Sequence, residues 1–372
     1  MAPFFSRSEI AGVLAAQGLE HFGFVDTAGL GETDIRSLER RYARWIDRGN
    51  QGEMKYLASH AEMKYRPERL LSPVKTLILV MLPYGLPSAG AAAGRHASQE
   101  GTGGSFGRVA MYAFGRDYHK VLKKRLVNAA RQLHAGKGET DWRVFVDSSP
   151  LDERFFAAAA GLGRVGRNGL LIHPRFGSYH FVGEILTELR LDEEGAGVDP
   201  SAAEPGAACP KGCRACVKSC PTGALNEGGA LEARRCISYL TIEYSGAIPL
   251  DLRPLVGEHF FGCDLCQSSC PLNRRIGETQ VDDFLTPRAG ERVDLEEVLS
   301  IENRESMVKR FAGSPVLRLS LSQMRRNAML VAANAGAREL IKLIEAYRES
   351  DDPVVAEQAR WSLSRLGAAS SV

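Results

Sequence analysis

The sequence predicts an α+β protein built from three segments, and three observations support this prediction. Helical and strand patterns are mixed over residues 1–195, as in domains that pack helices against a sheet. All eight cysteines fall inside the next segment, residues 196–290. Residues 291–372 carry helical patterns. We therefore expect a mixed α/β domain, a metal-binding domain and a helical C-terminal region.

Five stretches of the first segment have a clear pattern. Residues 8–17 and 118–134 have helical periodicity. Residues 76–82, 143–146 and 169–172 are short apolar runs that read as strands. Together they predict a sheet with helices packed on it.

A long stretch without periodicity interrupts the first segment. Residues 86–107 are rich in Gly, Ala and Ser, which predicts a flexible surface loop. A loop of this length is either a lid over a site or a plain insertion. The sequence leaves both readings open.

The C-terminal segment predicts a HEAT-like arrangement of paired helices. Residues 322–335 and 337–348 have helical periodicity, and Asp352-Pro353 opens a further helix. That last helix places four apolar side chains on one stripe, namely Val355, Ala359, Leu363 and Leu366.

The cysteines form two runs that each end in Cys-Pro. The first run is Cys209, Cys213, Cys216 and Cys220, and the second is Cys236, Cys263, Cys266 and Cys270. Eight thiolates suit two 4Fe-4S clusters in a ferredoxin-like domain, in which the last cysteine of each run binds the other cluster. We expect one cluster on Cys209, Cys213, Cys216 and Cys270, and the other on Cys220, Cys236, Cys263 and Cys266.

Other uses of these cysteines fit less well. Four disulfides are typical of small secreted domains, whereas this chain has 372 residues. Two zinc sites would use paired C-x2-C hooks joined by a loop. The first gap holds three residues where ferredoxins have two, and Gly212 gives the backbone freedom to accommodate the extra residue.

Composition predicts an ordinary globular protein. The chain is 44% hydrophobic and 25% charged, with a formal net charge of +2. The longest apolar run, residues 77–82, is too short to cross a bilayer, and the first residues lack the apolar core of a signal peptide. We expect a cytoplasmic protein.

A glycine pattern near residue 163 does not indicate a dinucleotide site. Gly161, Gly163 and Gly166 match G-x-G-x-x-G. However, this run follows a predicted helix and precedes a predicted strand, the reverse of the order that presents a helix N-terminus to pyrophosphate. We therefore reject NAD binding here.

Several longer motifs resemble the epoxyqueuosine reductase family. They cover roughly residues 45–330. The matching stretches are 112–121, 147–154, 161–163, 172–178, 183–187, 234–243 and 262–267. Their combined length makes the resemblance much more specific than the cysteine spacing alone.

The resemblance implies an enzyme that reduces epoxyqueuosine to queuosine in the anticodon loop of tRNA. It implies a cobalamin-binding catalytic domain at 1–195, with two 4Fe-4S clusters passing electrons to the cobalamin. A low-potential donor such as ferredoxin or flavodoxin would supply those electrons. We expect a monomer that acts on tRNA and not at a membrane.

The resemblance nominates Asp147 as the acid that protonates the departing oxygen. An apolar pocket covered by cobalamin would raise its pKa and keep it protonated. The residues alone favour an N-cap role, because Ser148 and Ser149 follow and Pro150 is a good first helical residue.

The resemblance also implies five cofactor-binding residues, namely Arg154, Asn168, Ser178, Ser238 and Gln267. Arg154 and Ser238 also have plain readings as helix residues.

Asp117-Tyr118-His119 partly matches the Asp-x-His-x-x-Gly motif that carries a cobalt ligand in some corrinoid proteins. Leu122 occupies the position where that motif requires Gly. We therefore interpret His119 as a residue at the start of a helix rather than a cobalt ligand.

Basic residues in the second and third segments are candidates for tRNA binding. They are Arg274, Arg275, Lys309, Arg310, Arg325 and Arg326. Paired basic residues on amphipathic helices are more often a solvated face, and the residues alone favour that reading. The family resemblance favours phosphate contacts.

The chain departs from the usual family pattern at several positions near the motifs. They include Arg164, Arg167 and Gly169 in the glycine turn, and Tyr244-Ser245 after the 234–243 motif. Two other function classes stay open. One is a corrinoid-dependent reductase of another substrate, similar to a reductive dehalogenase, and the other is a ferredoxin-type electron donor.

Overall fold

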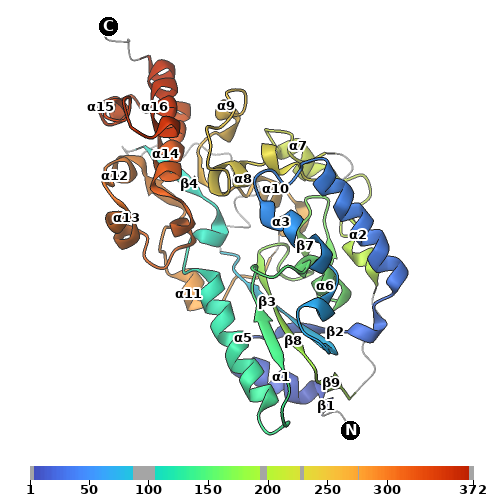
Figure 1. The fold of residues 1–372 in the computed structure, drawn as a ribbon. Helices are drawn as coiled ribbons and strands as arrows, with labels where there is room; N and C mark the ends of the chain where they lie inside the picture. Colours follow the sequence, from blue (N-terminus) through green and yellow to red (C-terminus); the bar gives the residue numbers. More distant parts are fainter. Residues whose placement is uncertain (1–3, 87–104, 193–198, 227–229, 275, 368–372) are drawn as a thin grey trace.

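The computed structural model describes residues 4–86, 105–192, 199–226, 230–274 and 276–367 (Figure 1). Figure 1 shows the C-terminal helices gathered at one end of the molecule and the largest sheet at the other, with the cysteine-rich segment beside both. Among the described helices, none combines the length and apolar character needed to cross a membrane.

A four-stranded antiparallel sheet forms the centre of the N-terminal segment. Its order is β2 (His21–Asp26), β3 (Thr76–Pro83), β8 (His180–Thr187) and β5 (Trp142–Phe145). Strands β3 and β8 pair along their whole length. The predicted strands at 76–82 and 143–146 are confirmed to within one residue. Strands β2 and β8 were not predicted.

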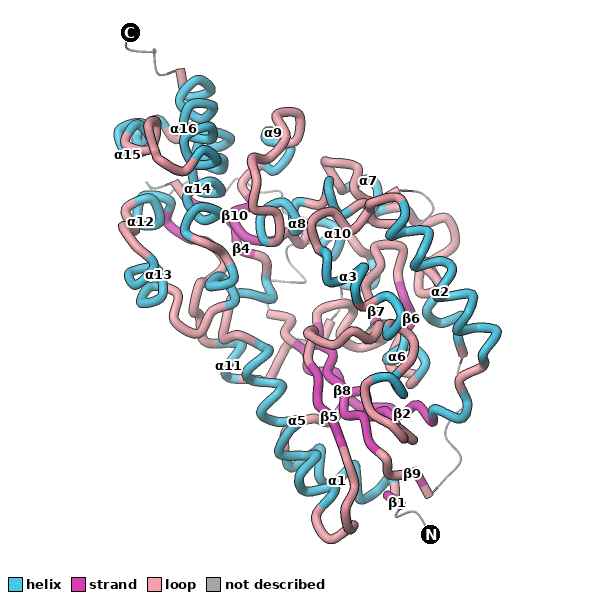
Figure 2. The backbone as a smooth tube through the Cα atoms, viewed as in Figure 1, coloured by secondary structure: helices cyan, strands magenta, loops and turns pink. Residues whose placement is uncertain are grey.

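Helices cover both faces of this sheet, as Figure 2 shows. On one face, α1 (Arg7–Ala16) and α5 (Tyr118–His134) bury their apolar residues against the sheet. On the other, α2 (Glu32–Asp47) and α6 (Glu153–Ala159) do the same. The predicted helix at 118–134 matches α5, which begins after the N-cap Asp117.

A second sheet joins the three predicted segments. Its order is β10 (His259–Phe261), β4 (Phe106–Val109) and β11 (Arg292–Asp294). Each segment contributes one strand, so the segments share this sheet. The boundaries at 195 and 290 therefore stay predictions.

Strand β4 also corrects the predicted loop at 86–107. Phe106 and Gly107 pair with β11 and are not loop. Residues 87–104 lie outside the described residues, so the reading of this stretch as lid or insertion stays untested.

The remaining elements of the first two segments are short. The helices are α3 (Lys55–Ser59), α7 (Ala215–Ser219), α8 (Ile237–Ile242), α9 (Arg253–Val256), α10 (Leu265–Ser268) and α11 (Asp282–Leu285). The strands are β1 (Phe4–Phe5), β9 (Arg190–Leu191), β6 (Arg164–Val165) and β7 (Leu171–Ile172). The predicted strand at 169–172 is therefore only two residues long.

The C-terminal segment is helical, as predicted. It contains α12 (Leu295–Leu299), α13 (Arg304–Arg310), α14 (Leu321–Ala335), α15 (Ile341–Glu345) and α16 (Pro353–Leu366). The side chain of Asp352 caps α16, and the predicted apolar stripe of that helix is buried. The predicted helix at 337–348 is instead a 3-10 turn followed by α15. The HEAT-like assignment stays a prediction.

Candidate active site

Asp147 lies in the turn that follows β5 and does not cap a helix. Its φ of 58° is in the left-handed region, and no other described non-glycine residue has a positive φ. The N-cap of α6 is Asp152, whose side chain accepts from the backbone N–H of Phe155. The N-cap reading of Asp147 was therefore wrong. A non-glycine residue held in this conformation is a feature often seen at functional sites.

Three side chains converge on one oxygen of Asp147. The Tyr118 hydroxyl donates to Oδ2 at 2.5 Å, and Nε2 of His119 lies 3.2 Å from the same atom. The guanidinium of Arg318 approaches Oδ2 to 4.0 Å. On its other side, Nδ1 of His119 contacts Oδ1 of Asp117 at 2.8 Å. The start of α5 thus delivers two proton-bearing groups to Asp147.

These contacts set the charges at the site. Burial opposes the charged form of His119, but its hydrogen bonds to Asp117 and Asp147 raise its pKa to about 9. Burial likewise acts to raise the pKa of Asp147, but the hydrogen bonds from His119 and Tyr118 and the charge of Arg318 hold it below its usual value. The expected rise in the pKa of Asp147 is therefore not seen with these neighbours.

Arg318 enters the site from the C-terminal segment. It ends the 3-10 turn Pro315–Arg318. Its guanidinium also binds the carboxylate of Glu243, which ends α8, at 2.6 Å. Arg318 thereby bridges two carboxylates from different segments.

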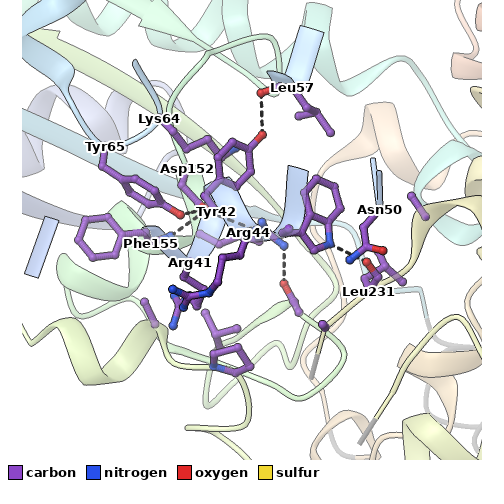
Figure 3. Close-up of a pocket in the computed structure, with 18 of the residues that line it drawn as sticks. Arg41, Tyr42, Arg44, Asn50, Leu57, Lys64, Tyr65, Asp152, Phe155 and Leu231 are labelled. Atoms are coloured by element: carbon purple, nitrogen blue, oxygen red, sulfur yellow. Dashed lines mark hydrogen bonds and ion pairs between the residues drawn. The ribbon is translucent and has the colours of Figure 1, made fainter. Parts of the chain in front are cut away.

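Asp147 lines one of two neighbouring cavities. One, of about 380 Å³, is lined by Asp147, Tyr118, Arg318, Cys236 and Ser238 among others. The other, of about 480 Å³, is shown in Figure 3. Both are lined by Met54, Leu231 and Ala233, so the two cavities adjoin at these side chains.

The larger cavity has a basic wall. Helix α2 supplies Arg41 and Arg44, and Lys64 lies on the neighbouring turn (Figure 3). The Tyr42 hydroxyl donates to the carbonyl of Leu57 at 2.9 Å, which fixes one aromatic side chain of this wall. The cavity can therefore hold a large ligand that carries both apolar and anionic groups.

A smaller cavity of about 110 Å³ is also lined by Asp147, together with Arg154, Ser178 and His180. Arg154 also lines the larger cavity and donates to the carbonyl of Gly169 at 2.8 Å.

Nδ1 of His180 is buried, and no hydrogen-bond partner for it is found among the described residues. Burial lowers the pKa of His180 to about 3, so the ring is neutral.

The other predicted cofactor residues lie at the edge of this space. Asn168 lines the larger cavity, and its amide donates to the carbonyl of Cys266 at 3.3 Å. Ser178 donates to Gln267 at 2.9 Å, and Ser238 lines the cavity that contains Asp147. The buried hydroxyl of Ser178 and side chain of Gln267 thus use part of their hydrogen-bonding capacity on each other.

The eight cysteines lie near one another in the fold, and their division into two cluster sets stays a prediction. One small cavity is lined by four of them, namely Cys209, Cys213, Cys216 and Cys270. The last of these comes from the second run, as the crossed arrangement requires. The thiols of Cys236, Cys263 and Cys220 are near enough to influence one another's ionisation, as are those of Cys266 and Cys236.

Within the described residues, no group of three His, Cys, Asp or Glu side chains is arranged to hold one metal ion. Burial raises the pKa of Cys236 and of Cys216, so cluster binding there must displace protons.

The predicted tRNA-binding residues have different environments. Arg274 and Lys309 are exposed. Arg310 binds Glu297 at 2.6 Å, and Arg325 donates to the carbonyls of Ile301 and Glu302. Arg275 lies outside the described residues.

Arg326 was predicted to contact tRNA, and the structure contradicts this prediction. Its side chain is fully buried, and its guanidinium donates to the carbonyls of Tyr244, Gly246 and Leu240. It holds α14 against the segment after α8, so it cannot contact tRNA in this structure.

Sequence reasoning missed three contributors to the site, namely Tyr118, Arg318 and Glu243. Tyr118 lies in the 112–121 family motif and beside His119, but nothing in the sequence points to its contact with Asp147. Arg318 was a candidate only for tRNA binding and Glu243 only a member of the 234–243 motif, because their contacts at the site join distant segments.

Family models match two parts of the chain. Residues 64–148 match the model described as epoxyqueuosine reductase QueG, DUF1730. Residues 209–273 match a 4Fe-4S double cluster binding domain, and this range contains all eight cysteines.

Curated relatives match nearly the whole chain. The epoxyqueuosine reductase of Pseudomonas aeruginosa is 37% identical over 340 residues, which is 91% of this chain and 90% of the relative. That of Escherichia coli is 35% identical over 358 residues, covering 96% of this chain and 90% of the relative.

Solved structures agree with these relatives. The structure of epoxyqueuosine reductase from Streptococcus thermophilus has a TM-score of 0.81 and 27% identity, covering 97% of this chain and 90% of that chain. An epoxyqueuosine reductase bound to an epoxyqueuosine-modified tRNA-Tyr stem loop has the same TM-score and coverage at 25% identity. In an epoxyqueuosine reductase from Bacillus subtilis with a TM-score of 0.80, 25% identity and the same coverage, a catalytic loop named after an aspartate is swung out of the active site.

Proposed function

Because this chain belongs to the epoxyqueuosine reductase family, we propose that it reduces epoxyqueuosine to queuosine in the anticodon loop of tRNA. The observation that carries the proposal is the position of Asp147, which lines a cavity together with Cys236 and Ser238 of the cysteine-rich segment. A relative that binds an epoxyqueuosine-modified tRNA stem loop supports the choice of substrate.

Cobalamin is the cofactor that we propose for the joined cavities. Their size, the basic wall of Arg41, Arg44 and Lys64, and the apolar side chains of Met54 and Leu231 suit a large amphipathic molecule.

The unpartnered Nδ1 of His180 lines the space around Asp147 and is free to bond a polar group of such a ligand. When bound, cobalamin supplies a reduced, nucleophilic metal centre, and the two clusters supply its electrons one at a time.

The cysteine positions suggest a direction for the electrons. Cys236 lines the cavity that contains Asp147, so the cluster on Cys220, Cys236, Cys263 and Cys266 would lie next to the reaction. The cluster on Cys209, Cys213, Cys216 and Cys270 would be the outer one and would accept electrons from a donor such as ferredoxin or flavodoxin.

Residues of the chain then supply the proton and bind the substrate. Asp147 is placed to protonate the departing oxygen, and Tyr118 holds its carboxylate in position. We propose that exposed Arg274 and Lys309 contact the tRNA phosphates. We further propose that the enzyme works as a cytoplasmic monomer.

Replacing Asp147 tests the function. Asp147→Asn should keep both clusters, cobalamin and tRNA affinity, while turnover falls by about 10²- to 10⁴-fold, the usual contribution of a positioned acid. The assay is nucleoside analysis of tRNA that carries epoxyqueuosine. The matched control is Asp141→Asn, which changes an exposed aspartate at the start of β5.

Two results would contradict the proposal. If the parent protein, loaded with both clusters and cobalamin, leaves epoxyqueuosine in tRNA unchanged, epoxyqueuosine is not its substrate. An Asp147→Asn protein that works at the parent rate would remove the acid role but not the substrate.

A further inference from the structure

The proposed acid has surroundings that favour its ionised form. Asp147 accepts a hydrogen bond from Tyr118, contacts His119 and lies near Arg318. A carboxylate with these neighbours releases its proton readily. Yet removing an epoxide oxygen to leave an alkene needs two protons and two electrons, so the site must hold protons elsewhere.

We propose that His119 stores the proton that Asp147 delivers and that Asp117 anchors His119 for this purpose. The proposal rests on the proposed function and adds a positioning residue to it. Its basis is a continuous chain of contacts, from Oδ1 of Asp117 to Nδ1 of His119 at 2.8 Å, and from Nε2 of His119 to Oδ2 of Asp147 at 3.2 Å.

Two protons pass along this chain of contacts to the departing oxygen. As the C–O bond of the epoxide breaks, the Nε2–H bond of His119 breaks and its proton passes to the carboxylate of Asp147. Asp147 gives this proton to the departing oxygen, which leaves a neutral imidazole and an ionised Asp147. The second proton leaves by the same route with the oxygen as water, while the two electrons come from the proposed clusters.

The position of His119 allows the imidazole to regain a proton from solvent. Its side chain is 30% exposed, so solvent can return a proton to Nε2 between transfers. Asp117 is fixed as the N-cap of α5 and also accepts from the backbone N–H of His119, so the anchor does not move away. Tyr118 stacks on the imidazole with ring centroids 4.1 Å apart, which fixes the plane of the ring.

The titratable groups around His119 come from four elements, and the carboxylates among them keep it protonated. Asp117 and Tyr118 come from the start of α5, and Asp147 from the turn after β5. Arg318 and Glu243 come from the 3-10 turn and from the end of α8, and they largely neutralise each other. The balance of these groups places the pKa of His119 at about 9.

Single-turnover rates of the reduced, cobalamin-loaded enzyme across pH 6 to 10 test the relay. His119→Gln should lower the rate at pH 7 by about 10²-fold, with unchanged tRNA affinity, and added imidazole should restore part of it. The parent rate should fall above pH 9 as His119 loses its stored proton. Asp117→Asn should move that fall to lower pH. Lys123→Gln, an exposed change on the same helix, is the control.

Nitrogen NMR of histidine-labelled protein gives a readout that does not need turnover. The His119 ring should stay protonated to about pH 9, and both Asp117→Asn and Asp147→Asn should lower this midpoint.

A His119→Gln enzyme that keeps the parent rate and pH profile would overturn the relay. Loss of activity without imidazole rescue, combined with an unshifted profile in Asp117→Asn, would also overturn it. A parent enzyme that does not convert epoxyqueuosine would instead overturn the proposed function, and the NMR midpoints would still decide where the proton is stored.

Discussion

Arg318 binds the carboxylate of Glu243 at 2.6 Å and lies 4.0 Å from Oδ2 of Asp147. It reaches both from the C-terminal segment, 171 positions beyond Asp147 in the chain. The helical region therefore does more than support the fold, because it completes the electrostatics of the candidate active site.

Removing the charge of Arg318 should raise the pKa of Asp147 and of His119. With Arg318→Gln, the uncompensated Glu243 adds negative potential, which favours the protonated form of both groups. The alkaline fall of the pH–rate profile should move up by on the order of one pH unit. Arg318→Lys keeps the charge and serves as the control. A shift to lower pH would show that Arg318 does not act on these groups through its charge.

The crossed pairing of the cysteines gives a second prediction. Cys270→Ala should remove the cluster of Cys209, Cys213 and Cys216, because Cys270 shares their cavity. Cys220→Ala should remove the other cluster. Iron should fall from about eight to about four atoms per chain in each variant.

Electron paramagnetic resonance of the reduced variants would identify which cluster remains. Identical spectra from Cys270→Ala and Cys220→Ala would contradict the pairing, since each should lose a different signal.

Local signals in the sequence predicted the parts of the fold that depend on local patterns. Helix α5 and the cap and stripe of α16 were correct because capping and helical spacing act within a few residues. The two cysteine sets rest on metal-ligand spacing and stay a prediction, although Cys209, Cys213, Cys216 and Cys270 line one cavity. Strand β4 was missed because four residues beside a Gly-rich stretch carry little periodicity, and its partners come from distant segments.

In the candidate site, too, the sequence identified a residue but not the contacts that depend on tertiary packing. Asp147 was found by resemblance, whereas its contacts with His119 and Arg318 depend on tertiary packing that no spacing reveals. Arg326 was misread for a related reason. A buried arginine that binds backbone carbonyls looks like a surface arginine in the sequence.

Arg326 should matter for stability and not for tRNA. Arg326→Leu leaves the buried carbonyls of Tyr244, Gly246 and Leu240 without their donor, so the free energy of unfolding should fall by about 3 kcal/mol or more. Denaturant unfolding of the anaerobic protein measures this.

Lys309→Glu is the contrasting variant, because Lys309 is exposed. It should leave stability unchanged, weaken tRNA binding and reduce the salt slope of binding by about one. A stable Arg326→Leu protein with weakened tRNA binding would restore the original reading of Arg326.

Glu184 should make stability depend on pH. It lies on β8 with 1% of its surface exposed, and burial raises its pKa from 4.5 to about 7, although the nearby Ser149 hydroxyl opposes the shift. The unfolded chain ionises Glu184 near pH 4.5, whereas the folded chain keeps the proton until about pH 7. Stability from this residue is therefore full below pH 4.5 and declines as pH rises to 7, by about 3 kcal/mol in total.

Glu184→Gln removes the titrating group and should abolish this decline. The variant should gain stability over the parent at pH 8 relative to pH 5, as measured by urea unfolding at the two pH values. Glu68→Gln changes an exposed glutamate and should leave the pH dependence as it is. If the Glu184→Gln protein shows the same pH dependence as the parent, Glu184 is ionised in the folded chain at neutral pH, and a counter-charge or water must reach it.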